Sequence, residues 1–248
     1  MQFKIFKEHN LIQGIPDSSF GSIRNDKQAI KFLKSLNYKN ISSRKLVWAQ
    51  QVFSSRVHIC QPKDYGKTIK NVDGLISNIP GQILSTISAD CVPILLYDPI
   101  NKVVSTLHGG RKCLIKGIIK NAIDKMVFNF GSKSKDILVG IGPHIRVCDY
   151  WLKEKTYKEL ESTKFKKYFK KRKSKIHFDL TKLVFNKLTV SGVKRKNIED
   201  CKICTYCQYK KYFSARKQEE SPKIYKEKNP RFASFIGLRT VFDKDNGE

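Results

Sequence analysis

Residues 74–142 carry a succession of short apolar segments that limits the possible folds more than any other feature of this sequence. Four segments of strand length follow one another, each bounded by turn-forming residues: 74–78, 82–88, 92–98 and 102–108. Apolar residues then recur at helical spacing from Leu114 to Val127, which is the pattern of an amphipathic helix that starts at Lys112. A buried strand over 136–142 follows and ends in Gly-Pro. The region therefore predicts a sheet with a helix packed on it.

The other predicted elements lie on both sides of this region. Asp179 can cap a helix that runs through Leu188 and is closed by Gly192. The rest of the pattern gives one or two strands in 45–59, a helix and a basic loop in 150–175, a strand entering a cysteine-rich turn in 197–207, a surface loop in 214–230 and a late strand in 231–239. Strands and helices mixed in this way predict one α/β or α+β domain with a mixed sheet.

Length and composition fit a single domain without a membrane-spanning part. The chain has 248 residues and 40% hydrophobic content, a size that one domain can reach. It contains no run of about 18 apolar residues, so no membrane span is expected. The stretch MQFKIFKEHN at the N-terminus is charged, which argues against a signal peptide. Seven cysteines in such a chain are expected to be reduced thiols in the cytoplasm.

The formal net charge of +27 raises the question of nucleic-acid binding. Of the 49 basic residues 39 are lysines, and they are spread from one end of the chain to the other. Specific recognition of phosphates or bases favours arginine, whose planar guanidinium makes paired hydrogen bonds. No specific nucleic-acid partner is therefore expected, although weak, salt-sensitive attraction to polyanions is.

Two adjacent predicted strands carry the residues best suited to chemistry. Asp90 and Cys91 end one strand, in SADCVPILLYDP, and His108 ends the next, in LHGGRK. A thiolate and an imidazole are ligands that Zn²⁺ prefers, and a catalytic zinc takes three protein ligands and a water. The same pair can instead be a cysteine nucleophile with its histidine base. A third interpretation is that Cys91 is a small buried residue and His108 a turn histidine.

The residues after His108 are typical of an anion site. Gly109 and Gly110 allow close approach to the backbone, and Arg111 and Lys112 add positive charge where the predicted helix begins. The first backbone N–H groups of a helix lack partners within the helix and carry partial positive charge. The alternative is an ordinary surface helix start whose basic residues face water.

A second group of cysteines lies late in the chain. Cys201, Cys204 and Cys207 are separated by two residues each, and Cys148 lies far from them in sequence. A structural zinc site normally shows two separated CxxC pairs. Because only one cluster is present, we interpret Cys204 and Cys207 as packing residues.

The motifs together resemble the YfiH or laccase-domain family. The matching segments, in order, are NVDGLISN, GQILSTISADCVPILLYDP, KVVSTLHGGRKCLIKGIIKNAI, VGIGPHIRVCDY, FDLTKLVFNKLTVSGVKRKNIEDCKICTYC and YFSARK. The resemblance covers roughly 45–240, and 1–44 match less well. It implies an α+β fold, a single-domain α-β-β-α layered sandwich with mixed sheets that spans 1–248. Family members are usually cytoplasmic and monomeric.

The same resemblance implies an activity. Older descriptions call these proteins multicopper polyphenol oxidases, and the family is now regarded as zinc-dependent purine nucleoside phosphorylases. They convert adenosine or inosine and phosphate into the free base and ribose 1-phosphate. Adenosine deaminase and methylthioadenosine phosphorylase activities accompany this reaction. The expected partners are thus purine nucleosides and phosphate, and the expected cofactor is Zn²⁺.

The family's zinc ligands carry over to this chain only in part. Cys91 and His108 match two of them, but the histidine of the family's QVHG segment is replaced by Phe53, in QVFS. Phenylalanine cannot bind a metal. His58 lies five residues further on, which in a strand means the opposite face and about 16 Å away. His144, which follows the IGP turn, is the other candidate for the missing ligand.

The substrate-binding positions also depart from the family pattern. The motif HAGWRG becomes HGGRKC, so Arg111 replaces a tryptophan, and Lys112 replaces an arginine and attracts phosphate as a point charge. Arg216, in FSAR, can reach the substrate or only hold its loop. Asp90 can accept a proton or cap its turn.

These departures leave other functions open. The first is a non-catalytic family member that serves as a binding or partner protein. The second is a cysteine hydrolase that uses Cys91 and His108, and the third is a nucleic-acid binder.

Overall fold

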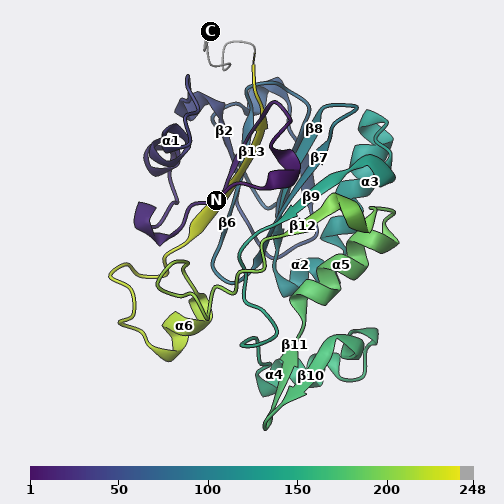
Figure 1. Ribbon diagram of the computed structural model, residues 1–248. Coiled ribbons are helices and arrows are strands. Elements are labelled where there is room, and N and C mark those ends of the chain that lie inside the picture. The colour runs from purple at the N-terminus through teal and green to yellow at the C-terminus, as the bar shows by residue number, and fades with distance from the viewer. Residues whose placement is uncertain (241–248) are drawn as a thin grey trace.

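The fold is built on two mixed β-sheets that lie face to face (Figure 1). The computed structural model describes residues 1–240. The five-stranded sheet has the order β1 (Leu11–Gly14), β13 (Phe232–Leu238), β6 (Ile83–Ser88), β2 (Leu46–Ala49), β4 (Thr68–Ile69). The six-stranded sheet has the order β12 (Ile198–Asp200), β9 (Leu138–Ile141), β7 (Val92–Asp98), β8 (Val103–Gly109), β5 (Gly74–Ser77), β3 (Val57–Ile59). Each sheet contains both parallel and antiparallel neighbours.

Helices cover the outer face of each sheet (Figure 1). Helix α1 (Asp26–Ser35) packs on the five-stranded sheet. Helices α2 (Arg111–Ile115), α3 (Ile118–Phe130) and α5 (Leu180–Val190) pack on the six-stranded sheet. The smaller elements are α4 (Glu154–Leu160), α6 (Ala215–Glu220) and a hairpin of β10 (Phe169–Arg172) and β11 (Lys175–Phe178).

Strand β7 contributes side chains to two hydrophobic cores, one on each face of its sheet. Ile94 and Leu96 point to the helix-covered face, while Leu95 and Tyr97 point to the face between the sheets. All four are almost completely buried, because successive side chains of a strand alternate between faces and both faces are covered. The expected α-β-β-α layered sandwich with mixed sheets is therefore confirmed.

Most predicted elements are present, with three differences. The helix expected from Lys112 to Val127 is two helices, because Gly117 takes a left-handed conformation at φ 91° between α2 and α3. The basic loop expected within 150–175 is partly replaced by the β10–β11 hairpin, which extends to Phe178 and whose exposed lysines conceal the strand pattern. The surface loop expected at 214–230 begins with α6.

The chain within 1–240 contains no helix that is both long and apolar enough to cross a membrane. All seven cysteines are free thiols.

Candidate functional site

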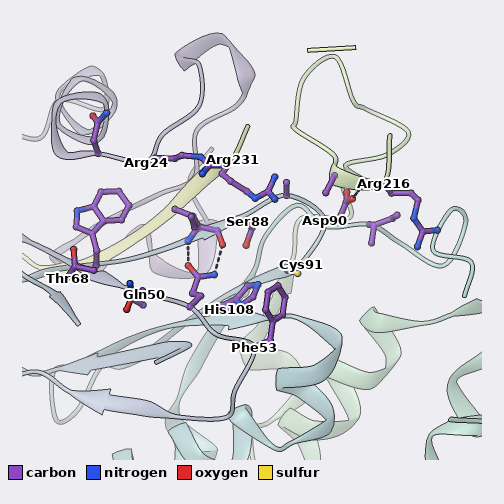
Figure 2. A pocket seen from close by; sticks show the side chains of 18 of the residues that line it. Arg24, Gln50, Phe53, Thr68, Ser88, Asp90, Cys91, His108, Arg216 and Arg231 are labelled. Carbon is purple, nitrogen blue, oxygen red and sulfur yellow. Dashed lines mark hydrogen bonds between the residues drawn. The ribbon is translucent and has the colours of Figure 1, made fainter. Parts of the chain in front are cut away.

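A cavity of about 940 Å³ opens at the edge of the sandwich where strands of both sheets end (Figure 2). Its walls come from the loop after β2, the turn between β6 and β7, the end of β8, the loop after β9 and the start of α6. The segments before α1 and at the start of β13 close the remaining side. This volume lies within the range of pockets that bind small molecules.

Cys91 and His108 meet in this cavity, as the sequence predicts (Figure 2). Contrary to expectation, Cys91 does not end a strand but lies in the turn just before β7. His108 lies near the end of β8, and because β7 and β8 are antiparallel neighbours the two residues still come to the same edge of the sheet. The Nδ1 atom of His108 lies 2.9 Å from Oδ1 of Asp73. A carboxylate only accepts hydrogen bonds, so Nδ1 carries the hydrogen and Nε2 is the nitrogen left for Cys91.

The charges around His108 favour its protonated form. Burial lowers the pKa of His108, but the electrostatic interaction with Cys91 and the hydrogen bond to Asp73 outweigh it and raise the pKa well above its ordinary value. Burial raises the pKa of Asp73, but hydrogen bonds from His108 and Ser54 reverse this and hold it well below its ordinary value. These interactions therefore favour an ionised carboxylate at Asp73 and a protonated imidazole at His108.

Asp73 also shapes the loop that carries Phe53. Its carboxylate accepts hydrogen bonds from the backbone N–H groups of Val52, Phe53 and Ser54, at 3.2, 3.0 and 2.7 Å. Phe53 adopts a left-handed conformation with φ 57°, which is uncommon for a residue with a side chain. The three hydrogen bonds hold this strained turn, and the half-exposed Phe53 ring meets the His108 ring edge-on at 5.0 Å.

Neither candidate for a third zinc ligand reaches the cavity. Nε2 of His58 lies 2.8 Å from Asp64, and His58 is not a lining residue. His144 is completely buried, with Nδ1 2.8 Å from the Gly142 carbonyl and Nε2 2.8 Å from the Thr181 hydroxyl. Burial lowers the pKa of His144 to about 4, so this ring is a neutral part of the interior.

The donor set therefore fits a resident metal poorly. Cys91 and His108 are the two ligands in the cavity wall, where a catalytic zinc takes three. The buried Cys113 thiol also lies near His108, but on the side of Nδ1, at 3.8 Å, and it is not part of the lining. A proton and a metal ion also compete for Nε2 of His108. One thiol and one imidazole are equally too few for a centre of several copper ions.

The predicted anion site at the start of α2 is not part of the cavity wall. The Arg111 guanidinium donates to the Tyr150 hydroxyl at 3.2 Å, and Lys112 is exposed outside the lining. A Cβ atom on Gly109 would lie 2.6 Å from the Val92 carbonyl oxygen. One on Gly110 would lie 3.2 Å from the Phe53 ring. These glycines allow close packing of backbone and rings.

Three arginines from other segments supply the positive charge in the cavity. Arg24, Arg216 and Arg231 all line it, and Figure 2 shows Arg24 beside Arg231, with Arg216 across the opening. Burial and the neighbouring charge of Arg24 lower the pKa of Arg231, whereas Cys91 and Asp90 act in the opposite direction. Within residues 1–240, neither Arg24 nor Arg231 forms an ion pair. The pair is thus a concentration of charge that an anion would relieve.

Arg216 is held differently. Its guanidinium donates to the Trp151 carbonyl at 3.0 Å and lies 4.3 Å from the centre of the Trp151 ring. It also forms an ion pair with Glu219 at 3.8 Å. These contacts fix Arg216 as one wall of the cavity.

Asp90 lines the cavity, but its carboxylate is engaged by neighbouring segments of the fold. It has φ 82°, and its Oδ1 accepts from the Thr205 hydroxyl at 2.6 Å. Its Oδ2 accepts from the backbone N–H of Arg216 at 2.7 Å. Burial raises the pKa of this carboxyl above its ordinary value. Asp90 thus ties the β6–β7 turn to the start of α6.

Sequence reasoning missed Asp73, Arg24 and Arg231 as site residues. Asp73 lies in the motif NVDGLISN, just before β5. A carboxylate directly before a buried strand is the one local feature that could have marked it as a site residue. Nothing in the local sequence distinguishes Arg24 or Arg231 from the chain's many other basic residues.

Relatives of this chain have names that point to one activity. A protein of Borreliella burgdorferi named purine nucleoside phosphorylase is 33% identical over 201 residues, which are 76% of this chain and 83% of that protein. Purine nucleoside phosphorylase YlmD of Bacillus subtilis is 26% identical over 210 residues, covering 81% of this chain and 73% of the relative. A Bacteroides thetaiotaomicron purine nucleoside phosphorylase is 29% identical over 153 residues, 60% of this chain but 57% of that protein.

Solved structures share the fold. The hypothetical protein YfiH of Bacillus licheniformis matches with a TM-score of 0.81 at 23% identity, over 94% of both chains. YlmD of Geobacillus stearothermophilus matches with a TM-score of 0.80 at 20% identity, over 96% of this chain and 94% of the other. The family described as multi-copper polyphenol oxidoreductase laccase matches residues 6–239. With nearly the whole chain matched, this protein belongs to that laccase-like family, the family of YfiH and YlmD.

Proposed function

We propose that this protein is a purine nucleoside phosphorylase, which splits adenosine or inosine with phosphate into the free base and ribose 1-phosphate. The observation that carries the proposal is the Arg24–Arg231 pair, which shares one cavity with Cys91 and His108. The names of the relatives support the same activity.

The two arginines fit phosphate. A guanidinium donates two parallel hydrogen bonds to a phosphate, and each charged hydrogen bond of this kind contributes about 1.5–3 kcal/mol. A phosphate dianion between Arg24 and Arg231 also removes their mutual repulsion. In this proposal Arg24 and Arg231 bind the phosphate, whereas the sequence predicts this role for Lys112 and the start of α2.

The aromatic lining fits a purine. Trp48, Phe53 and Tyr150 all contribute to the cavity wall, and flat aromatic rings stack favourably on a purine base. Phe53 is exposed at 49%, so its ring face is available to a ligand.

His108 is the group best placed to deliver a proton to the leaving base. In phosphorolysis a phosphate oxygen forms a bond to the ribose C1′ while the C1′–N9 bond breaks, and its electron pair leaves with the purine. Protonation of the purine makes it a better leaving group. The proton at Nε2 of His108 serves this purpose, and Asp73 keeps the imidazole charged and oriented.

This proposal gives zinc a smaller role in the reaction than the family resemblance implies. Cys91 and His108 can hold Zn²⁺ only as an incomplete ligand pair, so we propose that zinc binds here weakly, and the steps above do not depend on it. Adenosine deaminase activity, which would need a metal-bound hydroxide at purine C6, is expected to be correspondingly low.

Asp90 and Arg216 act in this proposal as positioning residues. The Asp90 carboxylate holds the N-terminus of α6 against the turn that carries Cys91. Arg216 lines the cavity while bound to Trp151. We further propose that the protein acts as a monomer in the cytoplasm, where its free thiols would stay reduced.

The test is release of free base from inosine or adenosine by the purified protein, with and without phosphate. Phosphate-dependent release is expected. In Arg231→Gln we expect the KM for phosphate to rise roughly tenfold or more, because a charged hydrogen-bond partner of the phosphate is lost. The KM for the nucleoside should change little. Base and ribose 1-phosphate are measured by chromatography.

Arg44→Gln is the matched control, because it removes the same charge from an exposed residue outside the cavity. An equal rise in both variants would mean that overall charge, and not a phosphate site, sets the KM. Complete inactivity of the folded wild-type protein would favour the non-catalytic alternative.

A second candidate function has its own supporting geometry. Cys91, His108 and Asp73 form a thiol–imidazole–carboxylate series, which is the arrangement of a cysteine hydrolase. A hydrolase would form its product without phosphate, and alkylation of Cys91 would abolish this activity. Phosphate dependence of product formation therefore separates the two candidates.

The proposed weak zinc binding can be tested by restoring the histidine ligand that Phe53 replaces. In Phe53→His, an imidazole replaces the ring that already faces His108 at 5.0 Å. We expect zinc affinity at this site to rise at least about tenfold, because a third ligand completes the set. Competition with a fluorescent chelator measures the affinity. The gain should disappear in Phe53→His/Cys91→Ala, and a gain that persists there would place the added zinc elsewhere.

A further inference from the structure

Three thiols and a carboxylate from two distant segments meet outside the cavity. Cys148 and Asp149 lie in the loop that follows β9, and Cys204 and Cys207 lie in the turn that follows β12. Strands β9 and β12 are parallel neighbours, so their carboxyl ends leave the sheet at the same edge (Figure 1). The topology thus joins segments that are more than 50 residues apart, as the separation of 56 between Cys148 and Cys204 shows.

The distances within this four-residue cluster are those of a metal site. The Cys148 sulfur lies 3.5 Å from the Cys204 sulfur and 3.8 Å from the Cys207 sulfur. The Asp149 Oδ2 atom lies 3.6 Å from the Cys204 sulfur and 2.8 Å from the Cys207 sulfur. All four ligand atoms lie within 4.8 Å of one another.

A tetrahedral zinc ion requires nearly these separations. With Zn–S bonds of about 2.3 Å, tetrahedral geometry places two sulfur ligands about 3.8 Å apart. With a Zn–O bond of about 2.1 Å, sulfur and oxygen ligands lie about 3.6 Å apart. The 3.5 Å between the Cys148 and Cys204 sulfurs is slightly shorter than this. The 2.8 Å contact between Cys207 and Asp149 is much shorter, since it is an S–H···O hydrogen bond whose proton the metal would replace.

The surroundings of the cluster also suit a cation. Asp149 forms no ion pair within residues 1–240, although the chain has a net charge of +27. The nearest arginine in sequence, Arg146, is committed to Asp200, to which it donates through both terminal nitrogens. Its backbone N–H instead donates to the Cys204 sulfur at 3.5 Å, an outer hydrogen bond of the kind that orients a metal ligand.

We propose that Cys148, Asp149, Cys204 and Cys207 bind one structural Zn²⁺ ion, separate from the site at Cys91 and His108. Four protein ligands leave no open position, so the ion has a structural role. It joins the loop that carries Tyr150 to the turn that carries Thr205. Tyr150 lines the cavity, and Thr205 donates to Asp90, so the ion braces one wall of the candidate active site.

This proposal departs from the interpretation of Cys204 and Cys207 as packing residues. The expected second CxxC pair is absent, but the Cys148–Asp149 pair replaces it. Cys207 is exposed, which is unusual for a cysteine that only fills space. Cys201 has the same spacing to Cys204 but is not part of the cluster, because its partly buried side chain packs against the core between the sheets.

The experiment measures zinc per chain by elemental analysis, in protein purified without chelator and dialysed against trace zinc. The variant Cys91→Ala/His108→Ala removes the other site and is expected to retain about one zinc per chain. Adding Cys207→Ala to that variant should lower the content to a small fraction. Cys201→Ala is the matched control and should leave it unchanged. Because Cys207 is exposed, its removal should not unfold the chain.

Two further variants keep the test independent of folding. Asp149→Cys supplies four thiolates and should retain zinc, whereas Asp149→Ala should release it more readily to a chelator. Cobalt added to the metal-free Cys91→Ala/His108→Ala protein should give the visible absorption of tetrahedral cobalt–thiolate coordination, and this absorption should be lost with Cys207→Ala.

Three results would overturn the proposal. One is absence of zinc from the Cys91→Ala/His108→Ala protein after dialysis. Another is equal loss of zinc in Cys201→Ala and Cys207→Ala. The third is a mass lower by two hydrogens under reducing purification, which would mean that two of the thiols form a disulfide. None of these depends on phosphorylase activity, so the proposed function can fail without affecting this inference.

Discussion

Replacing Asp73 with asparagine is expected to lower the free energy of unfolding by about 3 kcal/mol, because it breaks a buried ion pair and leaves its partner charged. Asp73 is completely buried and accepts hydrogen bonds from His108 and from three successive backbone N–H groups at Val52, Phe53 and Ser54. The asparagine amide can satisfy only some of these donors. The left-handed turn at Phe53 then loses the contacts that hold it.

The loss should depend on pH in a defined way. The folded-state pKa of Asp73 is depressed, so its stabilisation is present above the unfolded value of about 4 and is lost as the pH falls towards the folded value. The folded-state pKa of His108 is raised, so its stabilisation is present below about 6.5 and is lost as the pH rises through the folded value. The difference between wild type and Asp73→Asn should therefore be largest between about pH 4 and 6.5.

Urea denaturation at several pH values measures this difference. Asp64→Asn is the matched control, because Asp64 also lies 2.8 Å from a histidine, His58, whose side chain is 33% exposed. Its loss should be smaller, since a partly exposed pair is screened by water. Equal losses in the two variants, or a difference that does not vary with pH, would contradict the assigned role of Asp73.

Replacing His108 with glutamine should lower kcat for phosphorolysis by about 10²–10⁴-fold, the usual contribution of a general acid. Glutamine can still donate a hydrogen bond, but it cannot release a proton. The KM for phosphate should change little, because the phosphate is assigned to Arg24 and Arg231. This separates the variant from Arg231→Gln, in which the KM for phosphate rises.

The pH–rate profile gives a second readout for His108. A general acid must be protonated, so wild-type activity should fall as the pH rises through the raised pKa of His108. This limb should be absent from the residual activity of His108→Gln. His58→Gln, outside the cavity, should keep both the rate and the limb. A kcat unchanged in His108→Gln would exclude His108 as the acid and would place the proton donor elsewhere.

The sequence predicted the scaffold well because strands and helices leave local periodic signals. The strands β5, β6, β7 and β8 fall where short apolar runs lie between turn residues. The Asp179 cap is confirmed, since its side chain accepts from Lys182 N at 2.9 Å. The β10–β11 hairpin was missed because three of the four β10 residues, Lys170, Lys171 and Arg172, are exposed and basic, so neither strand face reads as apolar.

Residues of the candidate site could be predicted only where reactive side chains lie next to a strand end. Cys91 and His108 meet because β7 and β8 are neighbours, which their closeness in sequence already indicates. The expected anion site at Arg111 and Lys112 followed from local features alone, and the fold turns these residues away from the cavity.

The layered α+β fold, the family and the placement of Cys91 and His108 beside neighbouring strands could all be predicted from local sequence patterns. That Asp73 orients His108, that Arg24 and Arg231 share the cavity and that Cys148 meets Cys204 could not, and these facts emerged from the folded chain. A strand or helix is encoded by neighbours a few residues apart. The residues in these groupings are between 35 and 207 positions apart in sequence, and only the path of the chain through both sheets brings them together.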